Sequence, residues 1–160
     1  MNEMVRLSDY IASERVILDL QAETKAEVLS ELAQLSAAVG LVPDAERVYR
    51  GLETREKLIS TAVGDGVAIP HTRCEGPEEI FLIIARSKQG IDFDSLDGKL
   101  THLFVAIIGP TEADRDQLKI LSRTARFLKR KEFREQAMAA ETPAEIIQLL
   151  SEEDQLLKTP

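Results

Sequence analysis

The stretch that decides the fold lies between residues 59 and 71 and reads ISTAVGDGVAIPH. Its apolar halves, residues 59–63 and 67–70, predict two short strands. The residues between them, 64–66, are Gly-Asp-Gly, and glycine adopts positive φ without steric cost, so a tight hairpin turn is expected there. A hairpin pairs its strands antiparallel, and the sheet that contains it therefore cannot be purely parallel.

The second of these strands is expected to stop at Pro70 and His71. Proline has no N–H and a fixed φ, so it can end strand pairing and hold the next residue in place. The histidine is then expected at a rigid strand end, where its ring can face solvent. A neutral imidazole is a good nucleophile near pH 7, and its attack on a phosphoryl group would give a phosphohistidine. The residue alone fits an ordinary surface histidine equally well, because most histidines are not catalytic.

Two near-continuous apolar runs follow this stretch and predict the centre of the sheet. They cover residues 80–85 and 103–108, and such runs are typical of strands that are covered on both faces. Gly98 is expected in the turn between them, and residues 16–20 indicate a further short strand near the N-terminus.

Helix signals precede the hairpin. Thr24 and Glu27 fit a capping box, in which each side chain binds the backbone N–H of the other residue, and Gly40 is expected to end the helix that follows. A second helix is expected to open at residues 43–44 (Pro-Asp) and to run to about Lys57.

Two more helices are expected near the C-terminus. Asp114 with Gln117 resembles a capping box, and residues 142–145 (Thr-Pro-Ala-Glu) supply a cap, a proline at the first position and a glutamate at the third. The expected core residues of these helices are Leu118, Leu121, Ala125 and Leu128, then Ile146, Ile147, Leu149 and Leu150. The order strand, two helices, four strands, two helices predicts an α/β fold, a three-layer α/β/α sandwich with a mixed β-sheet.

Length and composition limit the class of protein. A chain of 160 residues fits a single domain over residues 1–160, of which residues 151–160 are expected to be a frayed tail. The formal net charge of -8 disfavours binding to nucleic acid and to anionic membranes, and it permits a basic protein partner. Cys74 is the only cysteine, which indicates a reducing compartment. With neither a signal-peptide pattern nor a long apolar stretch, a cytoplasmic protein without membrane insertion is expected.

The segment from Arg55 to His71 resembles the active-site signature of the fructose/mannitol-type enzyme IIA family of the bacterial phosphotransferase system. The specific core is Arg-Glu at residues 55–56, Ser-Thr at 60–61, and Gly-x-Gly-Val-Ala-Ile-Pro-His at 64–71. A looser likeness extends from residue 7 to the last helix and includes residues 90–94 (Gly-Ile-Asp-Phe-Asp). This family includes the nitrogen-regulatory IIA proteins, and the resemblance implies a mannitol-type IIA fold.

The resemblance implies a phosphotransferase role that needs no cofactor and no metal. His71 would accept a phosphoryl group from an HPr-type phosphocarrier protein and pass it to a IIB-type or regulatory partner. Arg55 matches the family arginine beside the phosphohistidine, and its guanidinium presents a permanently charged donor fork to phosphate oxygens. Without the motif, Arg55 fits an ordinary solvated arginine near a helix end. The motif also implies turn or positioning roles for Ser60, Thr61, Gly64, Gly66 and Pro70.

One position departs from the family pattern. The family often has a second histidine near the start of the helix after the last strand, and here Gln117 takes that place. A glutamine donates a neutral hydrogen bond but carries no charge, which weakens phosphoryl stabilisation if it acts alone. Arg73, just past His71, and Lys119 are the candidates to supply charge instead.

Other polar residues have less specific interpretations. His71 and Cys74 could supply two metal ligands or a Cys-His nucleophile pair, but structural zinc takes four ligands, and a lone cysteine is more often a small buried residue. His102 opens an apolar strand and is expected to be structural. Asp65, Asp92 and Asp94 could present acidic groups near the rim of the site to a basic carrier.

A basic stripe is expected on the helix after residue 113, because five cationic residues recur every three or four positions. They are Arg115, Lys119, Arg123, Arg126 and Arg130. The stripe fits either a solvated helix face or a docking surface for an acidic partner.

Three functions fit the sequence. The first is a phosphocarrier with a regulatory, nitrogen-type role, favoured because no transporter, IIB or HPr-like segment is attached. The second is a sugar-specific fructose or mannitol IIA component that passes phosphate to a IIB partner. The third is a binding module that regulates partners without being phosphorylated, which Gln117 leaves open.

Overall fold

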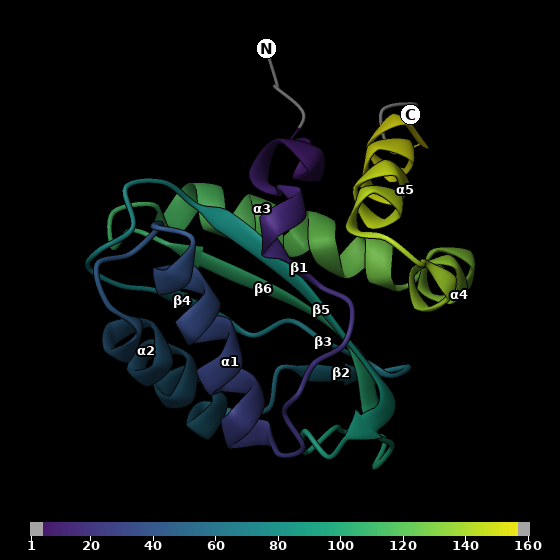
Figure 1. Cartoon of the computed structure of the whole chain (residues 1–160), viewed down its shortest axis with the longest axis horizontal. Helices are drawn as coiled ribbons and strands as arrows, with labels where there is room; N and C mark the ends of the chain where they lie inside the picture. The colour runs from purple at the N-terminus through teal and green to yellow at the C-terminus, as the bar shows by residue number, and fades with distance from the viewer. Residues whose placement is uncertain (1–4, 157–160) are drawn as a thin grey trace.

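The computed structural model describes residues 5–156, and a six-stranded sheet runs through its centre (Figure 1). The strands are β1 (Val16–Ile17), β2 (Ala62–Gly64), β3 (Val67–Ala68), β4 (His71–Arg73), β5 (Phe81–Ile91) and β6 (Thr101–Gly109). The α-helices are α1 (Lys25–Ala38), α2 (Ala45–Leu58), α3 (Asp114–Leu128), α4 (Lys131–Ala139) and α5 (Pro143–Leu156). Two short 3-10 helices, η1 (Leu7–Tyr10) and η2 (Ser13–Arg15), precede β1.

The sheet is mixed, as the hairpin predicts. The long strands β5 and β6 pair antiparallel at its centre, and β1 lies parallel to β5 on the outside. On the other side of β6, β3 and β4 pair with it one after the other, both parallel, and β2 pairs antiparallel with β3. Gly64, Asp65 and Gly66 all have positive φ, so the predicted turn is confirmed.

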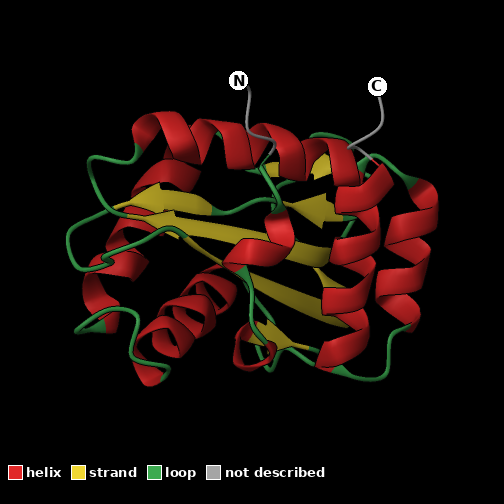
Figure 2. Ribbon diagram, turned by 90° about the horizontal axis from the view of Figure 1, so that it is seen from above, coloured by secondary structure: helices red, strands yellow, loops and turns green. Residues whose placement is uncertain are grey.

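Helices cover both faces of the sheet, which confirms the three-layer α/β/α class (Figure 2). Successive side chains of a strand point to opposite faces. In β5, Phe81, Ile83 and Ala85 pack into the cluster beneath α1 and α2. Leu82 and Ile84 pack into the cluster beneath α3, α4 and α5. The near-continuous apolar run therefore reflects burial on both faces.

The signals at the helix ends are confirmed in part. The Thr24 side chain accepts a hydrogen bond from the Glu27 N–H, 3.2 Å away, and Gly40 with φ +80° follows the end of α1. The Glu27 carboxylate, however, accepts from the Glu23 N–H instead of completing the box with Thr24. Asp44 caps α2 as expected.

The expected start of α3 is wrong, and its expected core face is confirmed in part. Asp114 lies inside the first turn, and the residue that precedes the helix, Ala113, makes no side-chain cap. Of the expected core residues, Leu128 is buried and Leu121 and Ala125 pack partly buried against the same cluster, whereas Leu118 is 66% exposed. The other buried positions of the helix are Gln117, Ile120, Thr124 and Phe127. Two of these buried residues are polar and have hydrogen-bond partners: the Gln117 amide donates to the Thr72 carbonyl at 2.9 Å, and the Thr124 hydroxyl donates to the Ile120 carbonyl at 2.8 Å.

Other elements also differ from expectation. The first strand is two residues long instead of five, and β4 and α4 were not expected. β4 has the polar sequence His-Thr-Arg and forms through its pairing with β6. α4 ends at a buried guanidinium, because Arg86 of β5 donates to the carbonyls of Ala137, Met138 and Ala140.

The C-terminal helix is longer than expected. α5 begins at Pro143 with the predicted Thr142 cap and continues to Leu156. Asp154 is 3% exposed, and its carboxylate accepts hydrogen bonds from the N–H groups of Leu7 and Ser8 and from the Ser8 hydroxyl. The expectation of a frayed tail is therefore wrong for residues 151–156, and residues 157–160 lie outside the described range.

Candidate active site

His71 lies at the junction of two strands. β3 ends at Ala68, and β4 begins at His71, so that Ile69 and Pro70 interrupt the ladder beside β6. The Pro70 carbonyl accepts from the Ile107 N–H at 2.9 Å, which holds the interruption against the sheet. The expectation that His71 follows a strand is correct, and the structure adds that a second strand starts at the same residue.

The orientation of the His71 ring is set by its own backbone neighbour. Nδ1 donates to the Ile69 carbonyl at 2.8 Å, and a carbonyl can only accept, so Nδ1 carries the proton and Nε2 keeps its lone pair. The pKa of His71 is lowered from its usual value, mainly by burial and further by the charge of Arg55. The Ile69 carbonyl and Glu56 act in the opposite direction. The ring is therefore neutral at pH 7.

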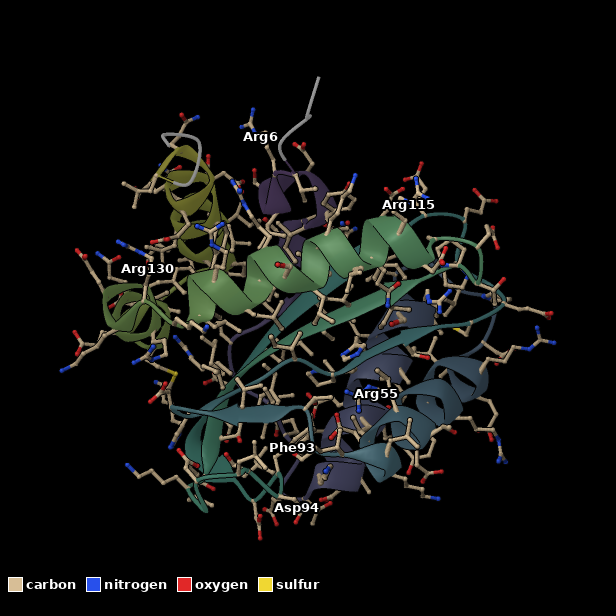
Figure 3. All side chains as sticks on the ribbon, turned by 180° about the vertical axis from the view of Figure 1, so that it is seen from behind. Arg6, Arg55, Phe93, Asp94, Arg115 and Arg130 are labelled. Carbon is tan, nitrogen blue, oxygen red and sulfur yellow. The ribbon has the colours of Figure 1, made fainter. Side chains whose placement is uncertain are left out.

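His71 lies in a cleft between α2, β4 and α3, where two adjoining hollows meet. Four guanidinium-bearing residues line it, namely Arg50, Arg55, Arg73 and Arg115. Arg50 and Arg55 come from α2, Arg73 from β4, and Arg115 from the first turn of α3; Figure 3 shows the separate positions of Arg55 and Arg115. This concentration of positive charge, in a chain whose net charge is -8, suits an anionic group beside the His71 ring.

Two of these arginines are held by backbone carbonyls. Arg55 Nη1 donates to the Ile59 carbonyl at 2.9 Å, just beyond the end of α2. Arg73 Nη1 donates to the Thr111 carbonyl at 2.7 Å, in the loop before α3. Each bond uses one nitrogen of a five-donor group and fixes its approach to the cleft. The structure thus brings both sequence-predicted arginines together with His71.

Gln117 lines the cleft, but its amide is directed elsewhere. It is 5% exposed, and Nε2 donates to the Thr72 carbonyl at 2.9 Å. Its Oε1 packs toward Gly109, where an added Cβ would lie 2.5 Å away, and has no hydrogen-bond partner among the described residues. Gln117 therefore links α3 to the strand that carries His71. Lys119 is exposed and does not line the cleft.

The remaining motif residues form the support of the site. The Ser60 hydroxyl donates to the Phe93 carbonyl at 2.6 Å and accepts from the Ala62 N–H. Thr61 donates to the buried Glu56 carboxylate through both its N–H and its hydroxyl. Gly64 and Gly66 lie in the hairpin, and Pro70 is buried, so these residues do not contact the cleft itself.

Sequence reasoning missed several residues near His71. Arg115 was assigned only to the basic stripe, but it lines the cleft. Arg130, just beyond the other end of α3, lies far from Arg115 (Figure 3) and pairs with Glu153. Arg50 and Gly51 carried no signal, because α2 had no chemistry assigned before its last turn. The motif glutamate, Glu56, was quoted without a role.

The acidic residues and the other nucleophile candidates lie elsewhere. Asp65, Asp92 and Asp94 are exposed and do not line the cleft. Cys74 is half-buried, and burial raises the pKa of its thiol, which opposes a nucleophilic role. His102 Nδ1 lies 3.0 Å from the Ser87 carbonyl, where the register between β5 and β6 shifts.

Metal-ligand groups and membrane-spanning helices are absent from residues 5–156. In this range, no three His, Cys, Asp or Glu side chains are grouped as metal ligands would be. Within the same residues, every helix is too short or too polar to cross a membrane.

The family model for the phosphoenolpyruvate-dependent sugar phosphotransferase system, EIIA 2, matches residues 9–153. The chain belongs to this EIIA type-2 family. It is 37% identical over 146 residues to the nitrogen regulatory protein of Bradyrhizobium diazoefficiens. This match covers 91% of this chain and 94% of that protein. The crystal structure of the nitrogen regulatory protein IIA-Ntr from Neisseria meningitidis matches with a TM-score of 0.83 and 29% identity, over 89% of this chain and 97% of that one.

The EIIA type-2 match also includes longer proteins. The fructose-specific EIIABC component of Bacillus subtilis is 29% identical over 150 residues, or 94% of this chain, but the match covers only 24% of that protein. The chain thus spans about a quarter of this relative. The resemblance inferred from residues 55–71 is confirmed as EIIA type-2 membership.

Proposed function

We propose that this EIIA type-2 chain is a phosphocarrier whose acceptor atom is Nε2 of His71. The observation that carries the proposal is the hydrogen bond from Nδ1 to the Ile69 carbonyl, in a cleft lined by four arginines. It leaves Nε2 as the nitrogen with a free lone pair, and burial keeps the ring neutral.

The proposed reaction moves a phosphoryl group from a histidine of the donor to His71. The lone pair of Nε2 forms the new N–P bond while the N–P bond of an HPr-type donor's phosphohistidine breaks, and that electron pair returns to the donor ring. The Nδ1 proton stays on His71, shared with the Ile69 carbonyl. The His71 ring is then positively charged. The guanidinium groups of Arg55, Arg73 and Arg115 line the cleft and would donate hydrogen bonds to the phosphoryl oxygens.

A regulatory, nitrogen-type role is favoured over a sugar-specific one. The chain is more similar to the nitrogen regulatory protein of Bradyrhizobium diazoefficiens, at 37% identity, than to the fructose-specific component, at 29%. A regulatory protein or a IIB-type protein would be the partner that reads or accepts the phosphoryl group.

The test is phosphorylation in a reconstituted relay. The protein is incubated with phosphoenolpyruvate, enzyme I and an HPr-type donor, and its intact mass is followed with time. One acid-labile phosphoryl group is expected on the wild type and none on His71→Ala, and NMR should place it on Nε2. Labelling of His71→Ala equal to that of the wild type, or no labelling of either, would refute the phosphocarrier role. Adding a sugar-specific IIB protein then separates the two branches.

A further inference from the structure

A buried carboxylate lies behind the His71 site. Glu56, on the last turn of α2, is 7% exposed, and its two oxygens receive three donors. These are the Thr61 N–H at 3.1 Å, the Thr61 hydroxyl, and the Lys25 ammonium of α1 at 3.1 Å. Removing a carboxylate from water is costly unless such partners satisfy it. Glu56 does not line the cleft itself.

A chain of backbone hydrogen bonds connects Glu56 to the His71 ring. Glu56 holds the Thr61 N–H, and the Thr61 carbonyl accepts from the Ile69 N–H at 3.1 Å. The Ile69 carbonyl in turn accepts from His71 Nδ1 at 2.8 Å. Two hydrogen bonds, through Thr61, therefore connect the Ile69 carbonyl that selects the His71 tautomer to the buried Glu56 carboxylate.

The same segment also holds the arginine of the site. Arg55 precedes Glu56 on α2, and its Nη1 donates to the Ile59 carbonyl, two residues before Thr61. The segment 59–61, directly beyond the end of α2, is therefore bonded to Arg55 through the Ile59 carbonyl and to Glu56 through Thr61. A displacement of this segment would move the guanidinium and the imidazole relative to each other.

We propose that Glu56 is a positioning residue for phosphoryl transfer: through Thr61 and Ile69 it fixes His71 with Nδ1 protonated and Nε2 free. The inference rests on the proposed function of His71. Its charge has a second effect, because a negative group near the ring stabilises the cationic form that phosphorylation produces. Lys25 also forms ion pairs with both Glu56 and the exposed Asp94, and its ammonium lies 4.8 Å from the centre of the Phe93 ring.

Other charged groups line the cleft around His71 and must stay unchanged in a test. They are Arg50 and Arg55 of α2, Arg73 of β4, and Asp114 and Arg115 of α3. Glu56→Gln preserves the shape of the side chain and alters none of them. Glu53→Gln is the matched control, because Glu53 lies one turn earlier on α2 and contacts Tyr49 and Lys57 instead.

The decisive measurement is the ¹⁵N spectrum of the His71 ring in the protein before any phosphorylation, recorded across pH. In the wild type and in Glu53→Gln, the Nδ1-protonated tautomer is expected to dominate. In Glu56→Gln, the Nε2-protonated tautomer should gain population, and the pKa of His71 should fall further, because a group that raises it has been removed. Phosphorylation should slow roughly ten- to hundredfold, the scale of an ångström-sized misplacement.

Two further variants separate positioning from folding. Thr61→Val removes the hydroxyl bond to Glu56 but keeps the N–H bond, so it should shift the tautomer in the same direction by less than Glu56→Gln. Thr61→Ser keeps the hydroxyl and should give the wild-type spectrum. If Glu56→Gln does not fold, Lys25→Met/Glu56→Gln removes the unpaired ammonium and takes its place. A folded variant without the Glu56 carboxylate whose His71 tautomer and pKa equal those of the wild type would overturn the proposal. A shifted tautomer in a protein that never accepts phosphate would refute the phosphocarrier role alone.

Discussion

At the scale of the residue, the His71 ring owes its state to three immediate surroundings. Burial disfavours its charged form, the Ile69 carbonyl fixes its proton on Nδ1, and the Arg55 guanidinium adds a nearby positive charge. A histidine at this point of the chain without these surroundings would titrate near its ordinary pKa of about 6.5 and sample both tautomers. The proposed nucleophile therefore has a free Nε2 lone pair before any donor binds.

Arg55 should control both the pKa of His71 and the rate of transfer. Arg55→Met removes a charge that lowers this pKa, so the pKa should rise, and loss of the guanidinium should slow phosphorylation by roughly a hundredfold. Arg55→Lys should keep the pKa low and slow the reaction less, because it retains the charge but loses the donor fork. NMR titration and the relay rate measure the two effects. Arg47→Met, also on α2 but outside the cleft, is the control, and an Arg55→Met rate equal to that of this control would remove Arg55 from the site.

The lowered pKa of His71 also predicts how stability depends on pH. The unfolded chain takes up a proton near pH 6.5, whereas the folded chain takes it up only at lower pH. The stability associated with His71 is therefore fully present above about pH 6.5 and declines as the pH falls toward the folded pKa. Urea unfolding of wild type and His71→Gln across this range should show a shallower acid slope for the variant. Parallel curves would contradict the assignment of a depressed pKa.

At the scale of the element, the site depends on how closely α2 and α3 approach β4. Gly51 of α2 faces Thr72 of β4, and a Cβ at residue 51 would lie 2.3 Å from the Thr72 Oγ1. From the other side, Gln117 of α3 donates to the Thr72 carbonyl. Thr72 follows His71 in β4, so α2 and α3 both contact the strand directly beside His71.

Gly51→Ala should push α2 away from the strand. Alanine favours the helix, but the overlap with Thr72 should make the net effect destabilising by about 1–3 kcal/mol. Phosphorylation should slow as well, because Arg55 moves with α2. Thr72→Ala in the same chain removes the overlapping hydroxyl and should recover part of both losses, which a double-mutant cycle measures. Strictly additive effects of the two substitutions would show that the two side chains do not conflict.

Gln117 should act as a link between elements more than as a phosphate ligand. Gln117→Leu leaves the Thr72 carbonyl without its buried donor and should lower the free energy of unfolding by about 1–3 kcal/mol. The phosphorylation rate should change less than in Arg55→Met, since the amide donates to the strand. A loss of rate as large as that of Arg55→Met, in a variant of unchanged stability, would instead place Gln117 on the phosphoryl group.

At the scale of the whole molecule, the first and last described elements are joined. Asp154 of α5 accepts from the backbone of Leu7 and Ser8, 147 and 146 residues away in sequence, and Figure 1 shows η1 near α5 above the sheet. This connection completes the layer on the α3 face, opposite α1 and α2, and it belongs to the fold although it lies outside the motif.

Asp154→Ala should therefore destabilise the whole protein. It leaves the buried Leu7 N–H without an acceptor, at a cost of about 1–3 kcal/mol, and the partly buried Ser8 N–H adds a smaller cost. Asp154→Asn should cost less, because the amide oxygen replaces one acceptor. Glu152→Ala, on an exposed position of the same helix, is the control for urea unfolding. If Asp154→Ala unfolds at the same urea concentration as this control, the connection does not contribute to stability.

Much of the fold follows from local sequence signals. The Gly-Asp-Gly turn, the two apolar central strands and the Thr24, Asp44 and Thr142 caps all appear in the structure, because each depends on neighbouring residues or on burial of a whole run. β4 and α4 were missed for the opposite reason. His-Thr-Arg becomes a strand only by pairing with β6, and α4 buries only Phe133 and Ala137.

The motif around His71, the proposed nucleophile, could be read from the sequence, whereas its surroundings were decided by the tertiary structure. Residues 64–71 identified His71 because turn, strand and proline are contiguous in the chain. The approach of Arg115, the commitment of the Gln117 amide to Thr72 and the burial of Glu56 depend on how helices far apart in sequence pack on one strand. Hydrogen bonds and charges act over a few ångströms of space regardless of chain distance, so sequence spacing alone could not reveal them.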